Sequence, residues 1–276
     1  MLRIAHLSDL HLHAEGSLGL RDLFGRRIFG AANLLLRRGK LHTVAAAMAA
    51  VEAARTADHC IVTGDLTNLA LEAEFALAAR VLGPLGGYDR LTVVPGNHDY
   101  YTPDAVRSSR FERHFGHTLW SEGADRVWPV VKDLEGVRIV ALCSPCLCPP
   151  MFSYGKLGQA QVEAAARLVA DARAQGRFTI VALHHNLHRR GVVNELTGRL
   201  LDRDQLRAAM LEAGADLILQ GHDHRPRTFD SRRPDGGTMR VAGAGSASLG
   251  PGCADIYVIT GSSFTVERWK GGQLTR

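Results

Sequence analysis

Five apolar stretches of this chain end in side chains that bind metal ions, and this repeated layout constrains the fold more than any other feature. The central stretch is residues 93–99, VVPGNHD. Its two valines are typical of the end of a buried strand, and the Pro-Gly pair interrupts that strand. We therefore expect Asn97, His98 and Asp99 to lie at the carboxyl edge of a sheet, where open α/β sheets place their chemistry.

Four further stretches repeat the layout of an apolar run followed by ligands. They are residues 4–11, 60–65, 179–185 and 217–224. Their terminal ligands are Asp9 and His11, then Asp65, then the paired His184 and His185, and finally His222 and His224. Five strand ends that carry Asp, His and Asn are hard to explain as separate coincidences, so we predict one shared site.

The order of apolar and amphipathic segments favours mixed sheets flanked by helices. Strands are expected at 2–8, 59–64, 91–95, 177–183 and 216–220, and helices at 41–56, 71–82, 159–174 and 202–212. Two strands are expected within 127–143, an irregular segment at 100–122, and tail strands at 239–242, 254–260 and 264–269. A chain of 276 residues is ample for a large core, and we predict a single α/β domain over residues 1–276.

The net charge of +5 is modest, and most arginines are scattered, as on a solvated basic surface. The exception is a basic insertion at about 18–40. Within it, residues 20–38 place Leu, Phe, Ile and Ala on one helical face and five arginines mostly on the other. One interpretation is a helix packed on the domain. The other is an amphipathic helix that contacts an anionic membrane or an acylated substrate.

Three of the five cysteines lie within residues 143–148. This group lacks a second pair at zinc-site spacing, so structural zinc and a disulfide are both disfavoured. Met1 leads straight into a strand rather than a signal peptide, and no apolar run reaches the roughly 18–20 residues of a membrane span. A cytoplasmic protein with free thiols is expected, peripheral to the inner membrane face if residues 20–38 bind lipid.

The ligand types indicate a centre with more than one ion. Asp9 and His11 are two apart on what we expect to be an extended segment, so both side chains point the same way, and His222 and His224 repeat this spacing. Asp65 adds a carboxylate that can bridge two ions. With the Asn97 amide and the His184 imidazole, the set has seven ligands, more than one tetrahedral ion uses.

Seven ligands suit two ions roughly 3.5–4 Å apart, each left partly open to water and substrate. Mixed nitrogen and oxygen ligands without thiolate favour Mn, Fe, Zn or Co. Metal identity and oligomeric state are not determined by this pattern.

The order of the motifs carries a family resemblance. Asp-x-His, Gly-Asp, Gly-Asn-His-Asp, His-His and Gly-His-x-His follow one another from Asp9 to His224. This succession resembles the calcineurin-like metallophosphoesterase superfamily, with every ligand block in its proper order. The resemblance implies a four-layer α/β/β/α sandwich of two mixed sheets flanked by helices, with a two-metal site in the loops.

Carried over residue by residue, the resemblance assigns Asp9, His11 and His224 to a first ion, Asn97, His184 and His222 to a second, and Asp65 to both. His98 would not bind metal but would contact the phosphate and assist the leaving group. The paired histidines are followed by Asn186, where many relatives carry Pro, so both His184 and His185 stay open as the ligand. Strand register favours His184.

The chemistry implied is phosphoester hydrolysis with Asp65 and His98 as catalytic residues. Two divalent ions lower the pKa of a bridging water, and the resulting hydroxide attacks phosphorus in line with the leaving oxygen. His98, if protonated, stabilises the phosphoryl oxygens or donates a proton to the leaving group, and general acid–base help of this kind contributes about 10²–10⁴-fold.

The substrate is predicted to be a small-molecule phosphodiester or pyrophosphate. The opening Ser-Asp-Leu-His resembles the cyclic-nucleotide phosphodiesterase branch most generally. The alternative is the branch that cleaves the pyrophosphate of UDP-diacylglucosamine at the membrane surface, because residues 20–38 combine apolar and basic side chains. A non-enzymatic scaffold conflicts with the complete ligand set. Nucleic acid is not expected, because few aromatic residues lie near the arginines.

Overall fold

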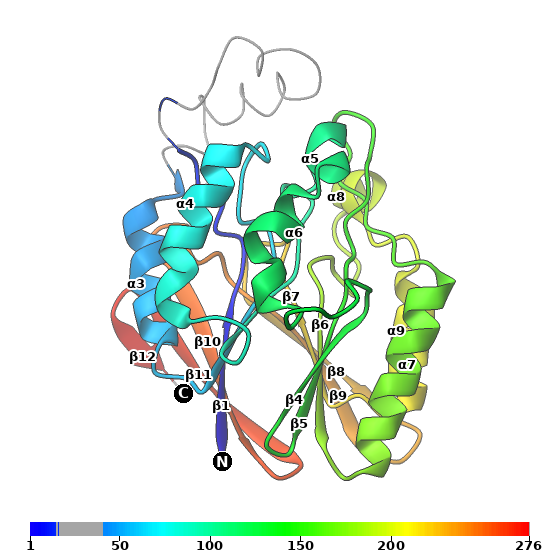
Figure 1. Cartoon of the computed structure of the whole chain (residues 1–276). Coiled ribbons are helices and arrows are strands. Elements are labelled where there is room, and N and C mark those ends of the chain that lie inside the picture. Colours follow the sequence, from blue (N-terminus) through cyan, green and yellow to red (C-terminus); the bar gives the residue numbers. More distant parts are fainter. Residues whose placement is uncertain (15, 17–40, 276) are drawn as a thin grey trace.

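The computed structural model describes residues 1–14, 16 and 41–275 (Figure 1). The predicted basic insertion at about 18–40, including residues 20–38, lies outside the described residues. Neither interpretation of that segment is therefore tested, and both stay predictions.

The first sheet contains six strands in the order β12-β11-β10-β1-β2-β3. Their bounds are β1 (Leu2–Leu7), β2 (His59–Val62), β3 (Leu91–Val93), β10 (Cys253–Thr260), β11 (Ser263–Lys270) and β12 (Gln273–Thr275). β1, β2 and β3 run parallel, with Ile4 opposite His59 and Cys60 opposite Leu91. β10, β11 and β12 add antiparallel neighbours on the other side of β1. The carboxyl ends of β1, β2 and β3 therefore open at one edge.

The second sheet also contains six strands, in the order β4-β5-β6-β7-β9-β8. Their bounds are β4 (Val130–Leu134), β5 (Val137–Ala141), β6 (Phe178–Ala182), β7 (Leu217–Gln220), β8 (Arg227–Arg232) and β9 (Thr238–Gly243). β5, β6, β7 and β9 run parallel, while β4 and β8 are antiparallel edge strands. The ends of β6 and β7 therefore open together at one edge of this sheet.

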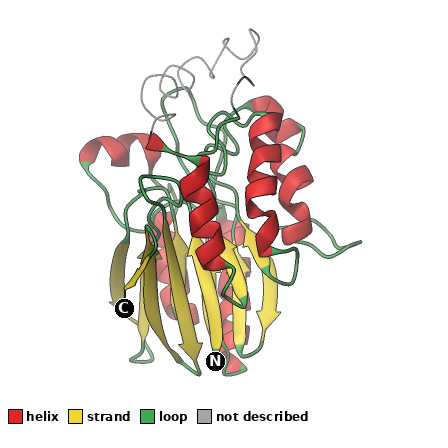
Figure 2. Cartoon of the chain, turned by 90° about the vertical axis from the view of Figure 1, so that its left-hand side faces the viewer, coloured by secondary structure: helices red, strands yellow, loops and turns green. Residues whose placement is uncertain are grey.

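Helices cover the outer face of each sheet (Figures 1 and 2). α3 (Val44–Ala54) and α4 (Glu72–Leu82) pack on the first sheet, and α7 (Gln159–Ala174) and α9 (Arg203–Ala213) pack on the second. Between the sheets lies a buried cluster drawn from both, which includes Ile4, Ile61, Ile180, Leu217 and Tyr257. The predicted four-layer α/β/β/α sandwich is confirmed.

Local signals explain where several elements begin and end. The Thr43 hydroxyl accepts the Ala46 N–H at 3.1 Å and caps α3. α9 ends at Gly214, whose φ of +85° is a left-handed conformation that glycine adopts without strain. No helix within the described residues is long and apolar enough to span a bilayer.

Several elements differ from the sequence prediction. The segment 100–122, expected to be irregular, contains α5 (Pro103–Arg107) and α6 (Arg110–Phe115). α8 (Val192–Gly198), β8 and β12 were not predicted. β8 and β12 are exposed edge strands, so they lack the alternation of buried and exposed residues that marks a strand in sequence.

Candidate metal centre

The predicted ligands follow parallel strands of both sheets and meet where the two sheet edges face each other. β1 leads to Asp9 and His11, β2 to Asp65, β3 to Asn97, β6 to His184, and β7 to His222 and His224. Because parallel strands end at the same edge, loops far apart in the sequence come together there. All seven predicted ligands are therefore brought to one place.

The ligand atoms form two overlapping groups, in each of which all of them lie within 4.8 Å of one another. The first group is Asp9, His11, Asp65 and His224, and the second is Asp65, His184 and His222. Asn97 adjoins the second group, with its Oδ1 3.2 Å from His184 Nε2. Asp65 belongs to both groups, which is the position that a bridging carboxylate would take.

The backbone at these ligands corrects one prediction. We expected Asp9 with His11, and His222 with His224, on extended segments, but all four have positive φ, from 44° to 73°. Asp65 is also left-handed, with φ of 53°. Non-glycine residues rarely adopt this conformation, and it is found where the surrounding structure enforces it. Tight left-handed turns, rather than strand alternation, therefore aim these side chains.

Two glycines permit the close approach of the loops. A Cβ on Gly96 would lie 2.2 Å from Asp65 Oδ1, and a Cβ on Gly221 would lie 2.0 Å from Ser8 Oγ and 2.9 Å from Asp9 Oδ2. All three distances are shorter than the contacts that real Cβ atoms make. Gly96 thus makes room for the Asp65 carboxylate, and Gly221 lets the β7 loop touch the β1 loop.

Backbone carbonyls orient two of the ligand histidines. His184 Nδ1 lies 2.7 Å from the Thr63 carbonyl oxygen, and His222 Nε2 lies 3.0 Å from the Gly198 carbonyl oxygen. A carbonyl only accepts, so these nitrogens carry protons. The opposite nitrogens, His184 Nε2 and His222 Nδ1, face each other at 3.1 Å. A hydrogen bond from the opposite ring nitrogen to a carbonyl is the usual way of orienting a metal-binding histidine.

The donor set fits divalent cations. Asp9 and Asp65 are almost fully buried, at 0% and 2% exposure, and the ring nitrogens of His11 and His224 lie 2.9 Å apart. Buried carboxylates and facing imidazole nitrogens at these separations favour positive charge between them. Nitrogen and oxygen donors without a thiolate suit Mn, Fe, Zn or Co.

The pKa shifts in the cluster agree with a preference for positive charge. Burial lowers the pKa of His184, but the charges of Asp65 and Asp9 and the hydrogen bonds to Asp65 and Thr63 together outweigh burial and raise this pKa to about 9. Burial likewise favours neutral Asp65, yet His184 and His98 hold the pKa of this carboxyl well below its usual range. The pKa of Asp9 is raised, because burial outweighs the attraction of His224 and His184. A metal ion exchanges with a proton at such a site.

His98 stands beside the cluster rather than in it. Its backbone N–H donates to Asp65 Oδ1 at 2.8 Å, and its ring Nδ1 lies 2.7 Å from the Asn68 carbonyl oxygen. The ring stacks on Tyr101 at 5.6 Å between centroids and meets His11 edge-on at 4.9 Å. The Asn68 carbonyl fixes the proton on Nδ1, so Nε2 is the nitrogen whose protonation can change.

Asp99 joins the β2 and β3 loops. Its carboxylate accepts the backbone N–H groups of Leu66, Thr67 and Gly96 at 2.9 to 3.3 Å, and also the Thr67 hydroxyl at 3.1 Å. Burial, together with the nearby charge of Asp65, raises the pKa of Asp99 to about 7. This acid therefore fixes the loop that carries Asp65.

The structure separates the two adjacent histidines of the β6 loop. His184 faces the cluster, whereas His185 turns away from it, with Nδ1 2.9 Å from Ser144 Oγ and Nε2 3.0 Å from the Ser153 carbonyl. Burial and the charge of His184 lower the pKa of His185 to about 3. This geometry supports His184 as the ligand of the pair.

Sequence reasoning missed His42, which the fold places against the cluster. Its ring lies 4.9 Å from that of His11 and 5.5 Å from that of His224, and its Nδ1 lies 2.7 Å from Ser248 Oγ. His42 follows no apolar strand, so the pattern that predicted the ligands could not single it out. The thiols of residues 143–148 lie outside the cluster, with Cys146 Sγ 3.9 Å from Cys148 Sγ.

Comparison with known proteins gives one family. The profile described as calcineurin-like phosphoesterase matches residues 2–226, most of the chain and every predicted ligand. No curated protein matches the sequence at a significant level.

Solved structures share the fold at low identity. Purple acid phosphatase PPD1 from yellow lupin seeds matches with a TM-score of 0.66 and 12% identity, over 99% of this chain and 52% of that one. A dimetal phosphatase from Danio rerio matches with a TM-score of 0.60 and 11% identity, over 98% of this chain and 95% of that one. Sulfate thiohydrolase SoxB from Thermus thermophilus matches with a TM-score of 0.57 and 15% identity, over 98% of this chain and 56% of that one. The chain thus spans about half of the lupin and Thermus proteins. At these identities the likeness concerns the fold alone.

Proposed function

Because the chain belongs to the calcineurin-like phosphoesterase family, we propose that it is a dinuclear-metal-dependent hydrolase of a phosphodiester or pyrophosphate bond. The observation that carries this proposal is the convergence of seven ligands on two overlapping groups that share Asp65. A single domain over residues 1–276, with the insertion at about 18–40, would hold the whole site.

In this proposal Asp9, His11 and His224 hold one ion, Asn97, His184 and His222 hold the other, and Asp65 contacts both. Such a pair of divalent ions offsets phosphoryl charge and activates a water molecule as the nucleophile. Manganese, iron, zinc and cobalt all accept these donors.

The surrounding residues would keep this donor set in place. Thr63 and Gly198 hold the ligand histidines through their carbonyl oxygens. Asp9 accepts the His222 N–H at 3.1 to 3.2 Å and so ties the two halves of the centre together. Hydrogen bonds of this kind to metal ligands influence metal affinity and the basicity of the ligands.

His98 would donate a proton to the leaving oxygen. The Asn68 carbonyl holds Nδ1–H and Tyr101 stacks on the ring, so the orientation of the imidazole is fixed. A protonated Nε2 could donate to the leaving oxygen, and such acid catalysis typically contributes about 10²–10⁴-fold.

The test uses the full chain, stripped of metal and reconstituted with Mn²⁺, Fe²⁺, Zn²⁺ or Co²⁺. We expect metal-dependent hydrolysis of bis-p-nitrophenyl phosphate or cyclic AMP, lost in His222→Ala. His117→Ala, which removes an exposed histidine outside the cluster, is the matched control and should keep full activity. Absence of turnover with every metal and substrate would overturn the proposal.

The UDP-diacylglucosamine alternative depends on residues 20–38, which lie outside the described residues. It predicts a preference for the lipid-linked nucleotide that disappears when residues 20–38 are deleted. Equal turnover of small diesters before and after the deletion would count against it.

A further inference from the structure

A cavity lined by arginines lies next to the β7 loop that carries two of the ligands. Its volume is about 400 Å³, and its walls include Arg189, Arg190, Asn194, Asp223, Arg225 and Arg227. Asp223 stands between His222 and His224, and Arg225 follows His224 directly. Since consecutive Cα atoms are about 3.8 Å apart, the cavity begins beside the candidate metal centre.

The arginines of this cavity differ in their partners. Arg190 lies 3.2 Å from Asp223 Oδ1 and donates to the carbonyls of Asn194 and Gly198. By contrast, Arg189, Arg225 and Arg227 have no ion-pair or hydrogen-bond partner for their guanidinium groups within residues 1–14, 16 and 41–275. Three unpaired guanidinium groups around one concave polar space favour an anionic ligand.

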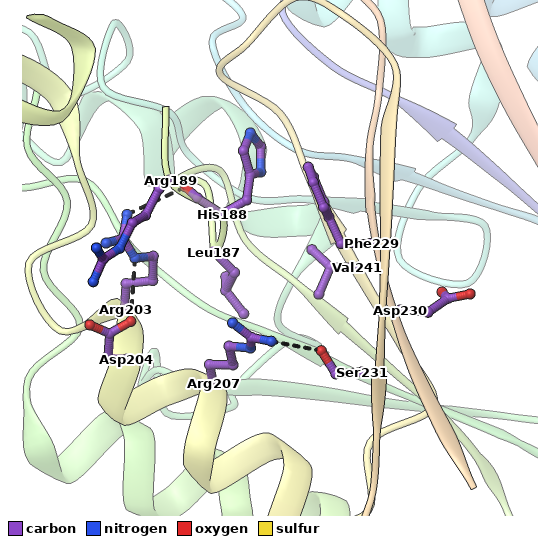
Figure 3. Close-up of a pocket in the computed structure, with 10 residues that line it drawn as sticks. All are labelled: Leu187, His188, Arg189, Arg203, Asp204, Arg207, Phe229, Asp230, Ser231 and Val241. Carbon is purple, nitrogen blue, oxygen red and sulfur yellow. Dashed lines mark hydrogen bonds and ion pairs between the residues drawn. The ribbon is translucent and has the colours of Figure 1, made fainter. Parts of the chain in front are cut away.

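A second cavity, of about 340 Å³, shares Arg189 with the first and is shown in Figure 3. Leu187 and Val241 give it an apolar surface, and Phe229 stacks on His188 with 4.6 Å between ring centroids. His188 Nε2 lies 2.7 Å from Asp223 Oδ2, so this wall is joined to the ligand loop. Arg189 lines both cavities, and one ligand could therefore present an anionic group to the first and an apolar or aromatic group to the second.

We propose that the arginine cavity binds a second anionic group of the substrate, beyond the phosphate that is cleaved. The substrate is then a phosphodiester or pyrophosphate that carries a further phosphate or carboxylate next to an apolar or aromatic moiety. This inference rests on the proposed function, because the metal centre fixes the end of the substrate that is hydrolysed.

A small molecule fits these features better than a lipid surface does. The unpaired arginines line a concave space rather than a flat face, and ligand sites of small molecules are concave with a few placed polar groups. A membrane surface would instead attract dispersed cations beside exposed apolar side chains, and Val192, Val193 and Leu196 of α8 are exposed near this cavity. The membrane reading is therefore an outcome to be tested.

The test compares two nucleotides that differ only in one phosphate. Binding of thymidine 5′-phosphate and thymidine 3′,5′-bisphosphate to the Mn²⁺-loaded full chain is measured by calorimetry. Charged hydrogen bonds to a phosphate favour the bisphosphate by about tenfold or more. In Arg225→Gln/Arg227→Gln this preference should fall to near unity. Arg167→Gln, an exposed arginine on α7, changes the charge elsewhere and should keep the preference.

Two further arms separate the possible outcomes. The 5′-p-nitrophenyl esters of both nucleotides test hydrolysis itself: a bisphosphate binding preference without turnover of either ester would refute the proposed function but keep the anion site. Turnover of both esters without any binding preference would refute the anion site alone. Sedimentation with phosphatidylglycerol vesicles tests the membrane reading. Vesicle binding that is lost in the double variant, with no nucleotide preference, would overturn the small-molecule assignment.

Discussion

The two sheets contribute to the candidate centre in different ways. The first sheet supplies both carboxylates, Asp9 and Asp65, from buried loops, and Asp99 links the Asp65 loop to the β3 loop. The second sheet supplies His184, His222 and His224, and its loops extend outward into the arginine cavity. The comparison indicates that the loops of the first sheet hold the two carboxylates in fixed positions. In our proposal, the loops of the second sheet form the surface that contacts the rest of the substrate.

The largest expected loss of activity follows substitution of a carboxylate from the first sheet. Asp65→Asn should lower the Mn²⁺-dependent kcat by more than about 10³-fold, because it changes a proposed ligand of both ions, whereas loss of a group that only hydrogen-bonds a metal ligand costs about 10–100-fold. Metal content, measured by elemental analysis, should fall with activity. The control is Asp216→Asn, which alters a buried carboxylate that accepts the Thr179 N–H at 2.9 Å, outside the cluster. Equal loss of activity in both variants would contradict the distinct role of Asp65.

The next effect concerns the proton rather than the metal. His98→Ala should keep the metal content but lower kcat by about 10²-fold or more on a substrate with a poor leaving group. The loss should be smaller for a p-nitrophenolate leaving group, which needs no proton. Full kcat on the poor leaving group, with metal bound, would exclude His98 from this role.

A third prediction addresses the contact between the halves. Gly221→Ala should weaken Mn²⁺ binding by about 10–100-fold, because the new Cβ would lie 2.0 Å from Ser8 Oγ. Ser8→Ala/Gly221→Ala removes that oxygen and should recover part of the affinity. The dissociation constant of Mn²⁺ is the measurement. A double variant no better than the single one would show that the Ser8 contact is not the cause.

The smallest effect on activity is expected at Lys132, which joins the halves away from the centre. From β4 its ammonium donates to the carbonyls of Tyr88, Leu91 and Thr118. Lys132→Met would leave three carbonyls without this donor and should lower the free energy of unfolding by about 2–4 kcal/mol. Urea unfolding measures that change, and kcat at low temperature should stay as in the wild type. A drop in kcat of the folded variant would mean that Lys132 also acts on the centre.

Much of the fold was predictable because its signals are local. Strand ends marked by apolar runs identified β1, β2, β3, β6 and β7, and alternation with helical segments indicated the layered α/β class. Edge strands such as β8 and the short helix α8 were not predicted, because exposed elements carry no apolar periodicity. The seven predicted ligands were named from the sequence alone, since each follows a strand that the sequence marks, and the structure brings them to one place.

The sequence by itself determined which residues could bind metal and in what order they occur, because residue chemistry and hydrophobic period are properties of short segments. Only the tertiary structure decided how they meet. The positive φ of Asp9, Asp65 and His222 is imposed by neighbouring loops rather than by local preference. Which of His184 and His185 faces the cluster depends on Thr63 and Ser144 from distant segments. Arg189, Arg225 and Arg227 line one cavity only because separate loops come together in space.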